Sequence, residues 1–231
     1  MKLLCTICAR AGSKGLKNKN FLRLLGVTLL VRTIKQALKI KSISNIVVST
    51  NAKSFSKIIN KKIFYLKRPI RLSGDKIGKI EVIRHALKEA EIFFKKDFDT
   101  IIDLDVTAPL RKISDIKKCI KIFKKKNYHN LITVCKSRKN PYFNMIEYKN
   151  NKFNYVKKLS KPLLRRQDAP KVYEVNAAIY LWNKKYLNKS INLLSNKTMC
   201  YEMPYNESID IDTKDDLQMV KAFIKNKWIK N

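Results

Sequence analysis

The chain begins with Leu3-Leu4-Cys5-Thr6-Ile7-Cys8-Ala9, an apolar run with the length of one buried strand, which continues into Arg10-Ala11-Gly12-Ser13-Lys14-Gly15-Leu16-Lys17-Asn18-Lys19-Asn20. Glycines let backbone N–H groups approach an anion, and serine, arginine and lysine side chains add donors and positive charge. This stretch therefore predicts a strand that ends in a phosphate-binding loop. An ordinary basic surface loop is the alternative, because lysine is frequent throughout the chain.

The loop differs from the two commonest nucleotide-binding patterns. It lacks the Gly-Lys-Ser/Thr that ends a Walker A motif, and it lacks the Gly-x-Gly-x-x-Gly of a dinucleotide fingerprint. The loop alone therefore indicates a phosphate group without saying which compound carries it.

Apolar periodicity along the rest of the chain predicts alternating strands and helices. The predicted helices are 29–39, 54–59, 80–94, 113–126 and 217–229. The predicted strands are 43–50, 63–66, 131–135 and 175–181, together with a central strand that starts at Thr100 and runs into a loop by Arg111. Such an alternation indicates a parallel sheet covered by helices. Between Lys136 and Tyr173 no long helix is evident, and aromatic, asparagine and basic residues dominate.

Composition bounds the class of protein. The 231 residues suit one domain with an elaboration or two small domains, and a hydrophobic content of 45% is enough for a full core. No apolar run reaches the roughly 18 residues of a membrane-spanning helix. Lys and Arg number 51 against 18 Asp and Glu, which gives +33. Because this charge is spread along the whole chain, we expect weak binding to polyanions at low salt and no specific nucleic-acid site.

The cysteines and histidines exclude some kinds of site. Five cysteines at scattered positions favour free thiols in a reducing cytoplasm. Cys5 and Cys8 form a C-x-x-C pattern inside a strand, where residues three apart face opposite sides, so we expect two buried core thiols. With only two histidines, a multi-histidine zinc site is excluded.

Two pairs of aspartates stand out in a chain that is poor in acids. Asp103 and Asp105 are two residues apart at the end of the central strand, so both face one side. Asp210 and Asp212 have the same spacing in an extended stretch, just before a residue suited to cap a helix, Thr213. Mg²⁺ in proteins usually takes one or two carboxylates plus phosphate oxygens. The second pair therefore predicts a metal site.

The loop resembles a known family. Ala9-Arg10-Ala11-Gly12-Ser13-Lys14-Gly15-Leu16, with Lys19-Asn20, is similar to the nucleotide-binding loop of the acylneuraminate cytidylyltransferases, the CMP-sialic acid synthetase family. Further segments resemble the family's motifs, in order, along nearly the whole chain. They are Arg68-Pro69-x-x-Leu72-x-x-Asp75, Thr107-x-Pro109-Leu110-Arg111, Arg166-Gln167-x-x-Pro170, Asn176-Ala177-Ala178-Ile179-Tyr180 and Ser208-x-Asp210-Ile211-Asp212.

Four positions depart from the family's pattern. Asp105 replaces a glutamine that lies near the sugar acceptor, and Glu174 stands where sialic acid enzymes carry a basic residue. Lys79 ends a stretch where the family has small hydroxyl residues near cytosine. Ala177 replaces a glycine, which we expect to tighten the approach to the sugar. These departures bear on which acceptor is used.

The resemblance implies a fold and an assembly. The fold is α/β, a mostly parallel Rossmann-like sheet with helices on both faces, of the nucleotide-diphosphosugar transferase type. Residues 1–135 and 177–231 form the nucleotidyltransferase core. Residues 136–176 form a small insertion that pairs two subunits and reaches over the partner's active site, so the resemblance implies a homodimer.

The resemblance also implies a reaction. CTP and a 2-keto-3-deoxy sugar acid, such as sialic or legionaminic acid, give a CMP-sugar and pyrophosphate. A Kdo-type cytidylyltransferase and a basic non-catalytic polyanion-binding protein are the alternatives. Nucleotide binding is expected at Arg10, Gly12, Ser13, Lys19, Asn20 and Arg68, with Arg10, Lys19 and Asp210 catalytic. Acceptor binding is expected at Asp105, Arg111, Arg166, Gln167, Tyr173 and Asn176. Asp210 and Asp212 are expected to hold Mg²⁺, or Mn²⁺ in its place.

Overall fold

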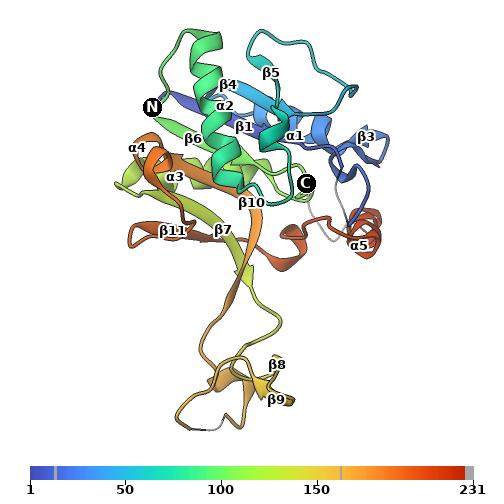
Figure 1. Ribbon diagram of the computed structural model, residues 1–231, viewed down its shortest axis with the longest axis vertical. Coiled ribbons are helices and arrows are strands. Elements are labelled where there is room, and N and C mark those ends of the chain that lie inside the picture. The colour runs from blue at the N-terminus through green and yellow to red at the C-terminus, as the bar shows by residue number, and fades with distance from the viewer. Residues whose placement is uncertain (13–14, 162, 227–231) are drawn as a thin grey trace.

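A seven-stranded sheet forms the centre of the computed structural model, which describes residues 1–12, 15–161 and 163–226 (Figure 1). Its order is β11 (Thr198–Glu202), β7 (Asn130–Lys136), β10 (Tyr173–Asn183), β6 (Thr100–Leu104), β1 (Leu3–Cys8), β4 (Ile43–Thr50) and β5 (Ile63–Lys67). Strand β1 pairs in parallel with β4 and β6, β4 with β5, and β11 with β7. Strand β10 runs antiparallel to both of its neighbours. The prediction of a mostly parallel sheet is confirmed.

Helices cover both faces of the sheet, as predicted (Figure 1). On one face lie α1 (Leu29–Leu38), α3 (Ile113–Lys125) and α5 (Lys214–Lys225), and on the other lie α2 (Lys79–Phe94) and α4 (Lys184–Lys189). Alternate residues of β1 feed the two layers, with Cys5 packed under the first set of helices and Leu4 under the second. Among the helices of the described chain, none is long and apolar enough to cross a membrane.

The two thiols of the C-x-x-C pattern lie as predicted. Both are free, and Cys5 packs into one hydrophobic layer while Cys8 contacts the other. Burial raises the pKa of each thiol well above its ordinary value, which keeps both protonated and unreactive.

The helix predicted at 54–59 is wrong. This segment has no regular structure in the described chain. The phenol oxygen of Tyr65 accepts a hydrogen bond from the Ile58 N–H at 2.7 Å and donates one to the Ile58 carbonyl oxygen at 3.0 Å. A side chain thus takes the backbone groups that a helix would have paired, and Phe55 packs on Tyr65 instead.

The last helix begins earlier than predicted. It starts at Lys214, directly after a capping box. The Thr213 hydroxyl accepts a hydrogen bond from the Asp216 backbone N–H, and the Asp216 carboxylate accepts one from the Thr213 backbone N–H. The predicted cap is confirmed. The helix runs to Lys225, and the rest of the predicted span, 227–229, lies outside the described residues.

Residues near the predicted insertion form a lobe below the main body, joined to it by the long strands β7 and β10 (Figure 1). A hairpin, β8 (Ile146–Lys149) and β9 (Lys152–Tyr155), lies in this lobe. The predicted boundary at 176 falls inside β10, where the pairing register shifts between Val175 and Tyr180. Ala177 sits at this irregularity with a φ of 54°, in the left-handed region that glycine favours. The backbone therefore gives a local reason for a glycine here, beside the expected approach of the sugar.

We expect Ala177→Gly to raise the free energy of unfolding by up to about 1 kcal/mol, because a left-handed conformation costs an L-residue about that much. Urea unfolding measures it. The matched control is Ala178→Gly, one residue on, where φ is not positive and the side chain is fully buried, so stability falls. A destabilised Ala177→Gly variant would contradict this explanation.

Candidate active site

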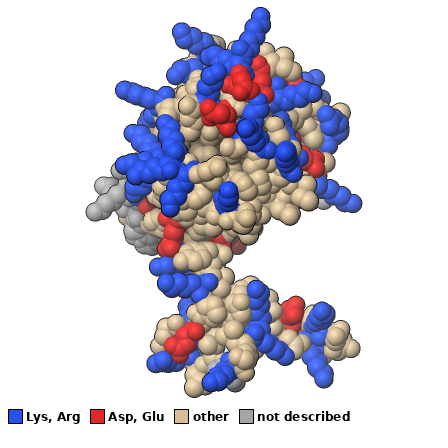
Figure 2. All heavy atoms as spheres, turned by 90° about the vertical axis from the view of Figure 1, so that its left-hand side faces the viewer, with Lys and Arg blue, Asp and Glu red and all other residues tan. Residues whose placement is uncertain are grey.

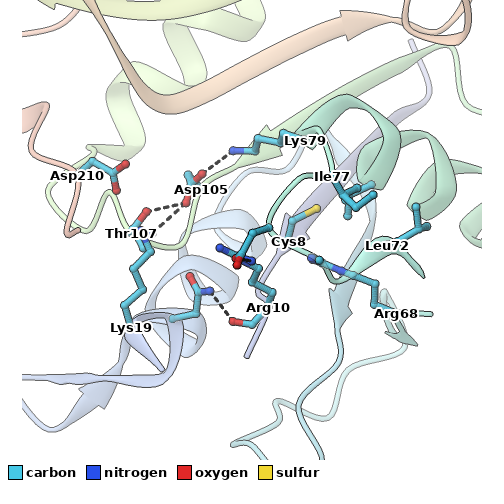
Figure 3. Close-up of a pocket in the computed structure, with 14 residues that line it drawn as sticks. Cys8, Arg10, Lys19, Arg68, Leu72, Ile77, Lys79, Asp105, Thr107 and Asp210 are labelled. Carbon is cyan, nitrogen blue, oxygen red and sulfur yellow. Dashed lines mark hydrogen bonds and ion pairs between the residues drawn. The ribbon is translucent and has the colours of Figure 1, made fainter. Parts of the chain in front are cut away.

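The predicted loop lies at the carboxyl edge of the parallel strands, where ligands bind in open α/β sheets. A cavity opens beside it (Figure 3). Its polar lining comes from the loop after β1, the segments after β5 and β6, the first turn of α2 and the stretch before α5. These side chains are Arg10, Lys19, Asn20, Arg68, Asp75, Lys79, Asp105, Thr107 and Asp210. Segments up to two hundred positions apart in the sequence thus meet at one place.

Two glycines explain the shape of the loop. Gly12 has a φ of +81°, a left-handed conformation. Gly15 packs so closely on the 210–212 segment that a Cβ atom there would lie 2.8 Å from the Asp212 carbonyl oxygen. The first and last motifs of the sequence are therefore in contact. Ser13, predicted to bind nucleotide, lies outside the described residues.

Cations line one side of the cavity. Lys19 forms an ion pair with Asp212, and Arg10 Nη1 lies 2.5 Å from Asp75 Oδ1. The Asn20 amide donates to the Arg10 carbonyl oxygen at 2.9 Å and so fixes the loop. These positive groups at a strand end suit a phosphate, as the sequence predicted.

Arg68 is buried at the cavity wall. Its Nε donates to the Ser49 hydroxyl at 3.1 Å and its Nη2 to the Ser49 carbonyl oxygen at 2.8 Å. Burial lowers the pKa of Arg68 from its ordinary value. The guanidinium is thereby held in one orientation at the cavity.

Both oxygens of the Asp105 carboxylate have bonding partners. Its Oδ1 accepts from the Thr107 N–H at 3.1 Å and from the Thr107 hydroxyl at 2.8 Å, while Lys79 Nζ lies 2.5 Å from Oδ2. Burial raises the pKa of Asp105, but the charge of Lys79 and these hydrogen bonds outweigh it and bring the pKa to about 2. Asp105 therefore stays ionised.

Asp210 has the opposite environment. Its Oδ1 is buried and, within 1–12, 15–161 and 163–226, has no hydrogen-bond partner. Burial first, and then the negative charge of Asp105, raise the pKa of Asp210 to about 6. The segment is fixed because the Ile211 N–H donates to the Thr107 carbonyl oxygen at 2.9 Å. An unpaired buried carboxylate oxygen beside Asp212 fits a hard cation that shares its remaining ligands with phosphate.

A second cavity shares Asp210 as a wall. Asn176, predicted to bind acceptor, lines it together with Glu174 and Ser208. The Asn176 amide donates to the Ser208 hydroxyl at 2.9 Å, and Glu174 accepts from the Ser137 hydroxyl at 2.6 Å. The Asp210 carboxyl group therefore belongs to the lining of both cavities.

The remaining predicted acceptor residues lie elsewhere. Arg166 and Gln167 are exposed in the short helix η3 (Arg166–Asp168) of the lobe, and Tyr173 is at the outer end of β10. None of the three lines either cavity of its own chain.

Arg111 lies behind the cavity instead of in it. It is buried, and its guanidinium donates to the carbonyl oxygens of Asp105 at 2.9 Å and Ala178 at 2.6 Å and to Gln36 Oε1 at 2.9 Å. These bonds tie the loop after β6 to β10 and α1. In place of the predicted contact with the acceptor, the structure gives Arg111 a supporting position.

Sequence reasoning missed Lys79, which it treated only as a departure from a pattern. The available signal was the Asp103–Asp105 pair, because two carboxylates at the end of a buried strand require a nearby positive charge. Nothing in the spacing identified Lys79 as that charge among so many lysines.

The described residues on the face shown in Figure 2 give no sign of a nucleic-acid site. Figure 2 shows lysine and arginine spread over the main body and the lobe on the face in view, without a single basic stripe. This agrees with the even spread of charge along the sequence.

Fold and site together define a class, an α/β nucleotidyltransferase with a basic, glycine-bearing loop facing paired carboxylates. A family model described as cytidylyltransferase matches residues 4–227. The chain is 39% identical over 229 residues to the CMP-N,N'-diacetyllegionaminic acid synthase of Campylobacter jejuni, covering 98% of this chain and 96% of that protein. It therefore belongs to the cytidylyltransferase family, and the family predicted from the sequence is confirmed.

Two further comparisons agree. A post-translational flagellin modification protein B of Campylobacter coli is also 39% identical over 229 residues, with the same coverage of 98% and 96%. Among solved structures, a CMP:2-keto-3-deoxy-manno-octonic acid synthetase complexed with CTP matches with a TM-score of 0.66, covering 98% of this chain and 100% of that one. At 15% identity this last likeness establishes the fold alone.

We expect Arg111→Lys to lower the free energy of unfolding by about 2 kcal/mol or more, because lysine cannot supply the forked donors and leaves buried acceptors unpaired. Urea unfolding measures the loss. The control is Arg165→Lys, whose partner Asp168 is exposed, where the change stays within about 0.5 kcal/mol. An Arg111→Lys protein of unchanged stability would contradict the supporting role and restore the predicted contact with the acceptor.

Proposed function

We propose that this protein transfers CMP from CTP to the anomeric hydroxyl of a nonulosonic acid, a nine-carbon 2-keto-3-deoxy sugar acid, and releases pyrophosphate. The observation that carries the proposal is the position of Asp210, which walls both the cavity beside the basic loop and the adjoining polar cavity. A reaction between two substrates needs a side chain that both substrates can reach. The relative named for N,N'-diacetyllegionaminic acid makes that sugar the first acceptor to test.

In this proposal the basic loop binds the triphosphate. Arg10 and Lys19 exchange their carboxylate partners for phosphate oxygens and stabilise the charge that develops on the leaving pyrophosphate. The backbone N–H of Gly12 adds a donor, and Asn20 holds the loop in shape through the Arg10 carbonyl. Arg68, which lines the same cavity, positions the nucleoside.

Asp210 and Asp212 would hold Mg²⁺, or Mn²⁺ in its place. The unpaired, buried Oδ1 of Asp210 supports this assignment, as does the predominance of carboxylate and phosphate oxygens among magnesium ligands. When bound, such an ion neutralises the α-phosphate and favours the ionised form of a nearby hydroxyl.

The chemistry requires one bond to form and one to break. The anomeric oxygen gives its proton to water as it bonds to the α-phosphorus, and the bond from that phosphorus to pyrophosphate breaks. Asp210 lines both cavities, so in this proposal it orients the reacting hydroxyl toward the phosphate. Asn176, in the second cavity, holds the sugar from the other side.

The proposal includes a homodimer in which the lobe of one subunit completes the partner's acceptor cavity. It is supported by the exposed positions of Arg166 and Gln167, which line neither cavity of their own chain. The lobe also exposes large apolar side chains, a feature of protein interfaces. They are Ile146, Tyr148, Phe153, Tyr155 and Leu164.

The test is pyrophosphate release from CTP and Mg²⁺ with four acceptors: N,N'-diacetyllegionaminic acid, N-acetylneuraminic acid, pseudaminic acid and Kdo. We expect release with a nine-carbon acid and much slower release with Kdo. Release with Kdo alone would replace the acceptor in this proposal. No release, together with salt-sensitive thermal stabilisation by any polyanion, would favour the non-catalytic alternative.

We expect Asp210→Asn to lower kcat by about 10²–10³, because an electrostatic contact at the reacting centre is lost. In the unaltered protein the carboxyl is protonated below its pKa of about 6. Mg²⁺ affinity should therefore fall about tenfold for each pH unit below 6 and level off above it. Thermal stabilisation by Mg²⁺ and CTP across pH 4.5–8 measures this.

The control for this prediction is Asp97→Asn. Asp97 is exposed, pairs with Lys184 and lies outside both cavities, so the variant should keep the activity and the pH profile. Near-normal turnover in Asp210→Asn would contradict the assignment.

A further inference from the structure

Lys79 joins two carboxylates across the wall of the cavity. It is the first residue of α2. Its Nζ lies 2.5 Å from Asp105 Oδ2 (Figure 3). The same atom lies 2.9 Å from Asp103 Oδ2. Asp103 is fully buried, and its other oxygen accepts from the Thr6 hydroxyl at 2.6 Å. The ammonium also lies 4.7 Å from the centre of the Tyr180 ring. This one cation therefore forms ion pairs with two carboxylates.

The bonds of Asp105 leave room for one more donor. An ionised carboxylate offers about four acceptor positions. Thr107 fills two on Oδ1 and Lys79 fills one on Oδ2. The Asp105 side chain is 21% exposed and lines the cavity, which leaves one acceptor position open to a ligand there. Because Asp105 stays ionised, that position accepts a hydrogen bond and repels an anion.

Asp105 and Asp210 line the same cavity, but their different bonding suits them to different ligands. Asp210 has a buried oxygen that finds no hydrogen-bond partner among the described residues, which suits a cation. Asp105 is held by Lys79 and Thr107, so it cannot turn toward a cation at Asp210 without breaking an ion pair. Both carboxylates line the cavity beside the basic loop, and the negative charge of Asp105 helps to raise the pKa of Asp210.

We propose that Lys79 is a positioning residue that fixes Asp105 as a hydrogen-bond acceptor for the sugar acid. The cavity then selects a sugar with a hydroxyl or amide N–H at this point, and it turns the sugar's own carboxylate away from Asp105. Lys79 acts through Asp105 and does not touch the sugar. This inference rests on the proposed function, because it concerns the acceptor of that reaction.

The test compares Lys79→Gln with the unaltered protein once the latter is shown to release pyrophosphate. We expect the KM for the acceptor to rise at least tenfold, while CTP binding measured at equilibrium changes less than twofold. Carbon NMR of the aspartate carboxyls supplies a readout independent of turnover. The pKa of Asp105, about 2 in the unaltered protein, should move upward when the ammonium is lost.

Two further variants separate positioning from folding. Lys112→Gln removes a similar ion pair, 2.6 Å to the largely buried Glu207, at a place that lines neither cavity. It should lose stability but keep the KM for the acceptor. The second is the double variant Lys79→Gln, Asp103→Asn, in which the buried Asp103 charge that lost its partner is also removed. Its free energy of unfolding should recover, while the KM for the acceptor stays raised.

The outcomes are distinct. A normal acceptor KM in Lys79→Gln, or an acceptor KM that recovers together with stability in the double variant, overturns the inference and leaves the proposed function standing. Loss of CTP affinity in place of acceptor affinity overturns it too, because Asp105 would then serve the nucleotide. An inactive unaltered protein overturns the proposed function, and the inference falls with it.

Discussion

The site depends on how buried carboxylates are neutralised. In a chain of net charge +33, the aspartates 103, 105, 210 and 212 gather at one end of the sheet. Lys79 pairs with the first two and Lys19 with Asp212, whereas Asp210 keeps a buried oxygen without a hydrogen-bond partner in the described chain. A buried charge without a partner is costly. The raised pKa of Asp210 reflects that cost, and a cation would remove it.

The fold brings these carboxylates and their positively charged partners together. Strands β1 and β6 are parallel neighbours, so the basic loop and the aspartate pair emerge at the same edge. The 210–212 segment is held there by a backbone bond to Thr107 and by the close approach of Gly15. Arg111, behind the cavity, ties the loop after β6 to β10. Segments distant in sequence are thereby fixed around one cavity.

Much of this arrangement could be predicted from the sequence. The apolar run 3–9, the glycines of the loop and the spacing of Asp210 and Asp212 are local patterns, and local patterns decide strands, turns and shared faces. The segment 54–59 was predicted wrongly, because a tyrosine seven residues from Ile58 captured its backbone. The Lys79–Asp105 pair and the burial of Arg111 depend on tertiary contacts, which no spacing in the sequence encodes. The left-handed backbone of Ala177 likewise follows from the irregular pairing of β10.

The central claim is that both substrates meet at Asp210. A crystal structure with CTP, Mg²⁺ and an acceptor whose anomeric hydroxyl is replaced by hydrogen would test it most directly. The account predicts a metal ion about 2.1 Å from oxygens of Asp210 and Asp212, with the α-phosphate and the anomeric carbon on either side. It also predicts that Asp105 remains bonded to Lys79 and accepts a hydrogen bond from the sugar. A triphosphate outside the basic loop, or a sugar bound away from Asp210, would contradict the account.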